Sequence, residues 1–318
     1  MSADPMIVLE GVGKVHEGGL RAVHDVSLSV ARGEVLVLVG ASGSGKTTLL
    51  RMINRLVEPS VGRVRVAGRD VTAVPGPELR RRIGYVIQGN GLFPHRTVAE
   101  NIATVPELLG WAPARVRARV DTLLATFGME PGRFRDRRPA QLSGGEAQRV
   151  GVARALAAEP PVLLMDEPFG ALDPVIRDRA QADLARVQAE TGTTVVLVTH
   201  DMEEALRLAG RIGVMAAGRL QQLATPAALL TAPATAGVAE LLGPGDRALR
   251  LLSLGRVEGL VEPGPAEGPA VAASLSLRAA LSECLWSSRT ALPVVAGDGR
   301  RLGRVTRAAI ERAGAGPG

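Results

Sequence analysis

Aromatic residues, cysteine and long hydrophobic runs are scarce in this chain of 318 residues. Phenylalanine, tryptophan and tyrosine together make up 2% of it, which excludes the aromatic stacking surface of a typical single-strand nucleic-acid binder. The single cysteine, Cys284, excludes an internal disulfide framework and a cysteine-based zinc cluster. We expect Cys284 to be a small buried side chain.

The chain also lacks an apolar run of the roughly 18 to 20 residues that a membrane-spanning helix needs. Its first residues show no basic segment followed by a long apolar stretch, so no secretion signal is indicated. With 46% hydrophobic residues the composition still suffices for packed cores. These observations predict a soluble globular protein of a reducing cytoplasm, with one large domain and a smaller one.

Lysine is almost absent, because Lys14 and Lys46 are the only two, whereas arginine is abundant and the net charge is +6. Such a charge is compatible with a nucleic-acid or anionic-membrane partner. Since aromatic residues are few, we expect no nucleic-acid partner.

A glycine-rich loop stands out against this background. Residues 40–47 match the pattern G-x-x-x-x-G-K-[ST], follow the apolar run 35–39 and precede a helical pattern that starts at Thr48. Glycines let backbone amides crowd around phosphate oxygens, and a helix N-terminus favours negative charge. Lysine and threonine then reach the terminal phosphates and Mg²⁺. The candidate phosphate-binding residues are Gly40, Ala41, Ser42, Gly43, Ser44, Gly45, Lys46, Thr47 and Thr48.

The pattern of apolar residues predicts a layered α/β domain around this loop. Residues 6–30 and 62–67 alternate as short antiparallel strands do, whereas 162–165 and 193–198 are continuous apolar runs typical of buried parallel strands. Helical patterns occupy 146–158, 174–190 and 201–209, and residues 97–158 show no convincing strand. We therefore expect a helical subdomain, about residues 89–160, inserted into the α/β core.

Two further motifs lie downstream of the loop. Asp166 and Glu167 directly follow an apolar strand, where one carboxylate suits Mg²⁺ coordination and the next can polarise an attacking water. Before them stands Leu-Ser-Gly-Gly-Glu at 142–146. The loop, this phrase and the carboxylates together resemble the ATP-binding subunit of an ABC transporter over residues 6–242. Gln88, the Ala171-Leu172-Asp173 turn and His200 stand where that family has its remaining motifs.

The resemblance implies an ATPase with ATP and Mg²⁺ as its nucleotide and metal. Glu167 would be the catalytic base, with Lys46, His200 and Gln88 as further catalytic residues, and Mg²⁺ would be held by Thr47, Gln88 and Asp166. It also implies a head-to-tail pair of two copies, or of this chain with a second ATPase subunit. Ser143 and Gly145 of one copy would close on the γ-phosphate held by Lys46 of the other, and Gly144 and Asp173 are further expected nucleotide-binding residues. His16 falls where relatives usually have an aromatic residue that stacks on adenine, and its imidazole is expected to bind the nucleotide with a smaller stacking surface.

A narrower resemblance comes from residues 91–111, which end in Pro-Glu-Leu-Leu-Gly-Trp. This segment is similar to importers of glycine betaine, choline, carnitine and proline betaine. The resemblance implies transmembrane permease subunits, a separate extracytoplasmic solute-binding protein and a place at the cytoplasmic face of the cell membrane. An importer for another small solute, such as an amino acid, stays open. A non-transport ABC ATPase fits less well, because only about fifty residues separate Gln88 from Leu142.

Glycine and proline after Leu242 mark a domain boundary near residue 245. Residues 246–318 then read as a small α+β module that resembles a single CBS repeat and would regulate transport as a pair across the ATPase dimer. The expected fold is thus a P-loop NTPase core of the ABC type, with a mixed sheet, an antiparallel β subdomain and a helical subdomain. Its domains would be residues 1–245 and 246–318.

Overall fold

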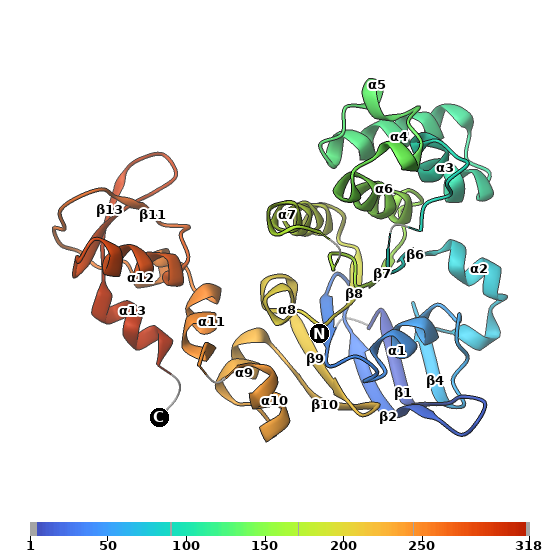
Figure 1. Ribbon diagram of the computed structural model, residues 1–318, viewed down its shortest axis with the longest axis horizontal. Coiled ribbons are helices and arrows are strands. Elements are labelled where there is room, and N and C mark those ends of the chain that lie inside the picture. Colours follow the sequence, from blue (N-terminus) through green and yellow to red (C-terminus); the bar gives the residue numbers. More distant parts are fainter. Residues whose placement is uncertain (1–4, 90, 171, 244, 316–318) are drawn as a thin grey trace. The chain divides into compact units, whose positions relative to one another are not determined.

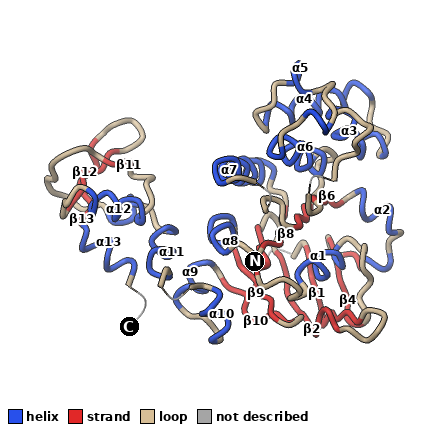
Figure 2. Tube along the Cα trace, in the orientation of Figure 1, coloured by secondary structure: helices blue, strands red, loops and turns tan. Residues whose placement is uncertain are grey.

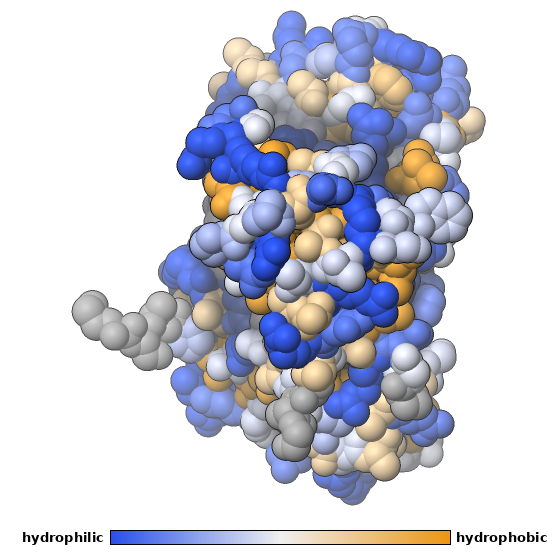
Figure 3. All heavy atoms as spheres, turned by 90° about the vertical axis from the view of Figure 1, so that its left-hand side faces the viewer, coloured by the Kyte–Doolittle hydropathy of each residue, from blue (hydrophilic) through white to orange (hydrophobic). Residues whose placement is uncertain are grey.

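The computed structural model describes residues 5–89, 91–170, 172–243 and 245–315. The chain forms two compact units, residues 1–223 and 224–318. Figure 1 traces the elements of both along the sequence. Among the described residues, no helix is both long enough and apolar enough to cross a lipid bilayer. On the face drawn in Figure 3, hydrophilic residues repeatedly interrupt the hydrophobic ones.

An antiparallel sheet forms one layer of the first unit, as the alternating pattern predicts. Its strands are β1 (Ile7–Val15), β2 (Arg21–Val30), β4 (Val61–Val66) and β5 (Arg69–Asp70), in the order β2-β1-β4-β5. β1 pairs with both long neighbours, so that Ile7 lies opposite Val30 on one side and Val66 on the other. Every second residue of β2 after Asp25 is buried, and these side chains join the main core.

The second sheet is the α/β core, with strand order β10-β9-β3-β8-β7-β6. Its three central strands, β3 (Val35–Val39), β8 (Thr194–Thr199) and β7 (Val162–Asp166), are parallel and almost fully buried, which explains their continuous apolar sequences. The outer strands are β6 (Ile83–Val86), β9 (Arg211–Ala216) and β10 (Arg219–Ala224). The carboxyl ends of β3, β7 and β8 therefore lie side by side, where polar residues follow each strand.

Helices connect these strands within the first unit. α1 (Lys46–Ile53) follows β3, α7 (Pro174–Thr191) follows β7, and α8 (Met202–Leu208) follows β8. A short 3₁₀ turn at Val71–Ala73 and α2 (Gly76–Arg81) lead from the antiparallel sheet into β6. The predicted helical patterns at 174–190 and 201–209 are confirmed.

The inserted segment is helical, as expected, and its described residues between 97 and 158 contain no strand. It comprises α3 (Val98–Leu108), α4 (Pro113–Thr126), α5 (Pro131–Phe134), a 3₁₀ turn at Pro139–Gln141 and α6 (Gly144–Leu156). α3, α4 and α5 gather at one end of the first unit (Figure 2), whereas α6 reaches the edge strand β6, where a Cβ on Gly84 would lie 2.5 Å from the carbonyl oxygen of Ala155. α3 and α6 both begin with a capping box, Thr97 with Glu100 and Ser143 with Glu146.

The second unit is a small α+β module. It contains α9 (Pro226–Thr231), α10 (Ala236–Leu241), α11 (Arg247–Leu254), a 3₁₀ turn at Val257–Leu260, β11 (Val271–Ala272), α12 (Leu277–Trp286), β12 (Ala291–Val295), β13 (Arg301–Thr306) and α13 (Arg307–Gly314). β12 lies between a parallel β11 and an antiparallel β13. Cys284 belongs to the core of this unit, and burial raises the pKa of its thiol, so the expected buried cysteine is confirmed.

The compact units divide the chain at residue 224, earlier than the boundary predicted near residue 245. Side-chain contacts explain the difference, since Arg247 of α11 donates to the carbonyl of Leu230 in α9, and Arg250 donates to the carbonyl of Leu242 after α10. α9 and α10 therefore pack with the second unit. The functional boundary between an ATPase domain and a regulatory module stays a prediction.

Candidate nucleotide site

The phosphate-binding loop joins the buried strand β3 to helix α1, as its sequence predicts. Two of its glycines have no room for a side chain: a Cβ on Gly40 would lie 2.1 Å from the carbonyl oxygen of Met215, and a Cβ on Gly45 would lie 2.3 Å from that of Ala22. Both have positive φ angles, 152° and 97°. A Cβ on Gly43 would meet nothing within 4 Å, so open space borders the loop there.

Lys46 is the first residue of α1 and is buried. Its Nζ donates to the carbonyl oxygens of Gly40 and Ala41 at 2.7 and 2.9 Å, and lies 3.3 Å from the hydroxyl of Ser44. Burial lowers the pKa of Lys46, although the nearby carboxylates of Glu167 and Asp166 oppose this shift. The loop thus holds a desolvated ammonium group against its own carbonyls at the helix start.

Thr47 and Asp166 form a second pair at this edge. The Thr47 hydroxyl donates to Asp166 Oδ1 at 2.8 Å, whereas Asp166 Oδ2 is buried without a hydrogen-bond partner. Arg51 lies 3.6 Å from Oδ2, beyond hydrogen-bond range, and contributes only charge. A buried carboxylate oxygen that accepts no hydrogen bond is costly, and the charge of the half-exposed Arg51 offsets that cost only in part. This orphaned oxygen beside a hydroxyl fits Mg²⁺, which favours such oxygen ligands and keeps several waters.

Glu167 brings together the other predicted catalytic residues. Its Oε1 lies 3.4 Å from Nδ1 of His200, and its Oε2 lies 3.4 Å from Nε2 of Gln88. The Glu167 side chain is 26% exposed and that of His200 is 63% exposed, so water reaches this group. Glu167 has φ of 46°, a strained angle for a non-glycine residue, and its amide donates to the carbonyl of Val198. The backbone bond holds the strained residue at the strand ends.

The Leu-Ser-Gly-Gly-Glu phrase lies at the start of α6 in the helical segment. The Ser143 hydroxyl accepts from the amide of Glu146 at 3.3 Å, and Glu146 Oε2 accepts from the amide of Ser143 at 2.7 Å. This backbone bond lowers the pKa of Glu146. A Cβ on Gly145 would lie 2.5 Å from Cγ2 of Ile176, whereas Gly144 faces open space. The motif thus satisfies its own polar groups and packs its second glycine against α7.

A family model described as ABC transporter matches residues 23–170, a range that includes the loop, Gln88, the Ser143 phrase and Glu167. The chain is 49% identical to the glycine betaine uptake system ATP-binding protein YehX of Escherichia coli over 299 residues, which cover 94% of this chain and 96% of that protein. The chain belongs to the ATP-binding subunits of ABC transporters. This ABC subunit is therefore an ATPase coupled to transport, with ATP and Mg²⁺ as its nucleotide and metal.

Two further comparisons agree. The glycine betaine/carnitine/choline transport ATP-binding protein OpuCA of Bacillus subtilis is 50% identical over 238 residues, 75% of this chain, which span 62% of OpuCA. The dimeric structure of the ATP-binding cassette MJ0796 is 34% identical, covers 70% of this chain and 99% of its own, and superimposes with a TM-score of 0.64. The expected family and fold of the ATPase core are confirmed.

Two predicted nucleotide-binding residues of the ABC subunit form local contacts in the structure. Asp173 caps α7 by accepting from the amide of Ile176 at 3.1 Å, and Ala171 lies outside the described residues. His16 is exposed in the turn after β1, where its amide donates to the carbonyl of Leu20. Their roles toward nucleotide, like those of Ser42 and Thr48 in and after the loop, stay predictions.

Two residues near the site were not identified by the sequence analysis. Arg51, one turn into α1, faces Asp166, and a charged residue in a helix gives no sequence signal of such a contact. Glu204 in α8 is buried close to His200, although its sequence position reads as an ordinary polar helix residue. Only the tertiary packing identifies these two side chains.

Proposed function

We propose that this ABC subunit powers the import of a quaternary ammonium osmoprotectant: glycine betaine, choline, carnitine or proline betaine. The observation that carries the proposal is the similarity to YehX, named as a glycine betaine uptake protein, which extends over 94% of the chain and so includes the second unit. An importer of another small solute, such as an amino acid, is the alternative. A betaine-type binding protein encoded beside this chain would favour the first.

The geometry supports a division of labour in hydrolysis. Glu167, partly exposed and held by its backbone, accepts the proton of the attacking water, while His200 and Gln88 lie within 3.4 Å of its two oxygens and orient it. Lys46 and the loop amides bind the terminal phosphates. Asp166 and Thr47 would hold Mg²⁺, which when bound neutralises charge on the phosphates.

The signature residues would act on a second copy. Ser143 and Gly145 stand at the N-terminus of α6, whose thirteen residues give it a helix dipole that favours an anion. No hydrogen bond joins them to residues 40–47 among the described parts of the chain. A head-to-tail dimer, the state named for MJ0796, would bring them to the γ-phosphate bound by its partner. ATP would then join two half-sites.

A groove beside Gln88 is suited to a permease subunit. It has a volume of about 510 Å³, and its apolar lining includes Ile87 and Phe93, which are 38% and 40% exposed. Arg154 also lines the groove and donates to the carbonyl of Gly91. A helix of a membrane subunit docked here would adjoin the residue that touches Glu167. The ABC subunit would thereby sit at the cytoplasmic face of the membrane, with an extracytoplasmic binding protein supplying the solute.

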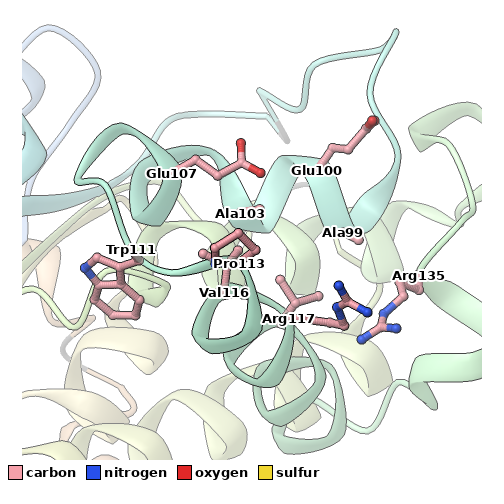
Figure 4. Close-up of a pocket in the computed structure, with 10 residues that line it drawn as sticks. Ala99, Glu100, Ala103, Glu107, Trp111, Pro113, Val116, Arg117 and Arg135 are labelled. Atoms are coloured by element: carbon pink, nitrogen blue, oxygen red, sulfur yellow. The ribbon is translucent and has the colours of Figure 1, made fainter.

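Trp111 ends the segment that resembles osmoprotectant importers. Figure 4 shows it at one end of a second pocket, of about 350 Å³, between α3 and α4. The guanidinium of Arg115 stacks on one face of its ring at 3.4 Å, and a single tryptophan does not make the aromatic cage that holds a quaternary ammonium group. Trp286, the other tryptophan, is 91% exposed at the end of α12. Solute recognition therefore belongs to other subunits.

The second unit would regulate transport as a CBS-like module paired with its copy. Its element order β11-α12-β12-β13-α13 and its separate apolar core support an independent module. Exposed Leu285 and Trp286 offer an apolar contact for such pairing. A chain truncated before Gly243 should transport without an osmotic response. Unchanged transport and unchanged response in that chain would refute the regulatory role.

Uptake in a host that lacks its own osmolyte importers tests the function. The ABC subunit is expressed with its neighbouring permease and binding proteins, and labelled glycine betaine, choline, carnitine and proline betaine are supplied. Uptake that is lost with Lys46→Ala supports the proposal. An assembled complex that hydrolyses ATP but takes up none of the four solutes would refute the osmoprotectant assignment and favour the alternative.

A further inference from the structure

The His200 side chain is 63% exposed and contacts Glu167 Oε1 at 3.4 Å, whereas the backbone of His200 is held through both of its neighbours in sequence. Thr199, the last residue of β8, donates its hydroxyl to Glu204 Oε2 at 2.8 Å. The same hydroxyl accepts from the amide of Asp201 at 3.0 Å. Glu204, in α8, is only 4% exposed. A buried carboxyl group thus fixes the residue before the histidine.

The residue after the histidine is fixed from the other side. Asp201 Oδ1 accepts from the amides of Glu203 and Glu204 at 2.9 and 3.3 Å, which caps α8. Its Oδ2 accepts from Arg177 Nη1 of α7 at 3.2 Å. Arg177 Nη2 donates in turn to the carbonyl of Leu172 at 3.0 Å. The bonds run from α8 to the turn that precedes α7.

Two polar atoms of this cluster have no partner. Glu204 Oε1 and Arg177 Nε are buried and form no hydrogen bond. One is an acceptor and the other a donor, and each unpaired buried group costs stability. Unsatisfied groups of this kind gather at functional sites, where a change of arrangement uses them.

The surroundings also set the charge of Glu204. Burial raises its pKa to about 7, the Thr199 hydrogen bond opposes this, Asp201 and Glu167 add to it, and Arg177 opposes it. These charged groups belong to the cap of α8, the residue after β7, and α7. Glu204 therefore changes its charge in the neutral pH range, close enough to Glu167 for the two carboxylates to interact.

We propose that Glu204 is a positioning residue that holds His200 in place for ATP hydrolysis, acting through Thr199. Arg177, acting through Asp201, ties the same histidine to the turn before α7. The inference rests on the proposed function of His200. It adds that His200 and the turn before α7 move as one unit. Glu204 itself touches neither nucleotide nor reacting atoms.

A double-mutant cycle on the full chain tests this role. Glu204→Ala should lower kcat about tenfold while KM for ATP stays within about twofold, because the residue acts through the histidine. In a His200→Ala background the same substitution should cause no further loss. Glu203→Ala, on the exposed side of the same helix, is the control and should keep wild-type kcat. Equal losses in both backgrounds would overturn the proposal.

The outcome separates this inference from the proposed function. Wild-type hydrolysis by His200→Ala would refute the role of the histidine and the inference with it. Impaired His200→Ala with unimpaired Glu204→Ala would refute the inference alone.

Glu204→Gln is a second variant that keeps the proposal testable if Glu204→Ala does not fold. The amide keeps the side-chain volume and its oxygen still accepts from the Thr199 hydroxyl, so this variant should retain kcat within about twofold of wild type. A loss of kcat in Glu204→Gln as large as the loss in Glu204→Ala would overturn the positioning role.

Discussion

The P-loop side of the nucleotide site keeps polar groups strained or unpaired, whereas the signature side pairs them within its own helix. Asp166 Oδ2 is buried without a hydrogen bond, and Glu167 has a positive φ angle. At the start of α6, Ser143 and Glu146 satisfy each other's backbone amides. A site that must bind a metal and a phosphate keeps its ligating atoms available at a cost in stability.

The contrast indicates how two such half-sites can work together. In the proposed dimer the signature side, whose polar groups are already paired, would need only to be brought to the nucleotide, while the P-loop side would gain partners when nucleotide and metal bind. Binding energy would thus be gained first on the P-loop side, and the signature side would contribute when two copies meet. Variants on the two sides should therefore separate nucleotide binding and hydrolysis from dimer formation.

The largest effect is expected from Glu167→Gln. The amide keeps the size of the side chain but cannot take a proton from water, so hydrolysis should fall on the order of a thousandfold. ATP should still drive dimer formation, because neither half-site loses a binding group. Phosphate release and gel filtration with ATP measure the two outcomes. The control is Glu190→Gln, which changes an exposed glutamate of α7. Wild-type hydrolysis by Glu167→Gln would show that Glu167 is not the catalytic base.

Lys46→Ala should act on binding as well as on hydrolysis. Loss of the buried ammonium group removes the charge that faces the terminal phosphates, and we expect hydrolysis and ATP affinity each to fall about a hundredfold. Lys14→Ala provides a matched control, since it removes the only other lysine, which lies in β1. Nucleotide titration followed by fluorescence would measure the affinity. Normal affinity in Lys46→Ala would contradict the P-loop interpretation.

Much of this site follows from the sequence because its determinants are local. The glycines at positions 40 and 45 are required by backbone crowding within one loop, and the order of loop, signature and carboxylates identifies the family. The buried parallel strands β7 and β8 are recognisable because they are apolar at nearly every position.

The remaining features depend on contacts between distant segments. The positive φ of Glu167 is not encoded by its residue type, and the burial of Glu204 arises only when α8 packs beside β8. The assignment of α9 to the second unit depends on the bond from Arg247 to Leu230. Periodicity describes one element at a time, so such relations between elements escape it.

Ser143→Ala should have a smaller effect, confined to the signature side. The variant loses the cap of α6, at about 1 kcal/mol of stability, and should lower ATP-driven dimerisation and hydrolysis roughly tenfold. ATP affinity of the single chain should not change. Thr97→Ala removes a similar capping box on α3 and controls for the loss of stability. Equal dimerisation by the two variants would show that Ser143 only caps its helix.

The smallest effect is expected at His16, which would contact only the base end of the nucleotide. Its imidazole is a narrower stacking surface than the aromatic ring of relatives, so His16→Tyr should raise ATP affinity on the order of threefold. At saturating ATP, hydrolysis and dimerisation should equal those of wild type, because the base end of the nucleotide lies away from the reacting phosphate. His24→Tyr on β2 is the control. If His16→Tyr changed dimerisation at saturating ATP, the turn after β1 would have to act on the contact between the two copies. Nucleotide binding could then no longer be assigned to the P-loop side alone.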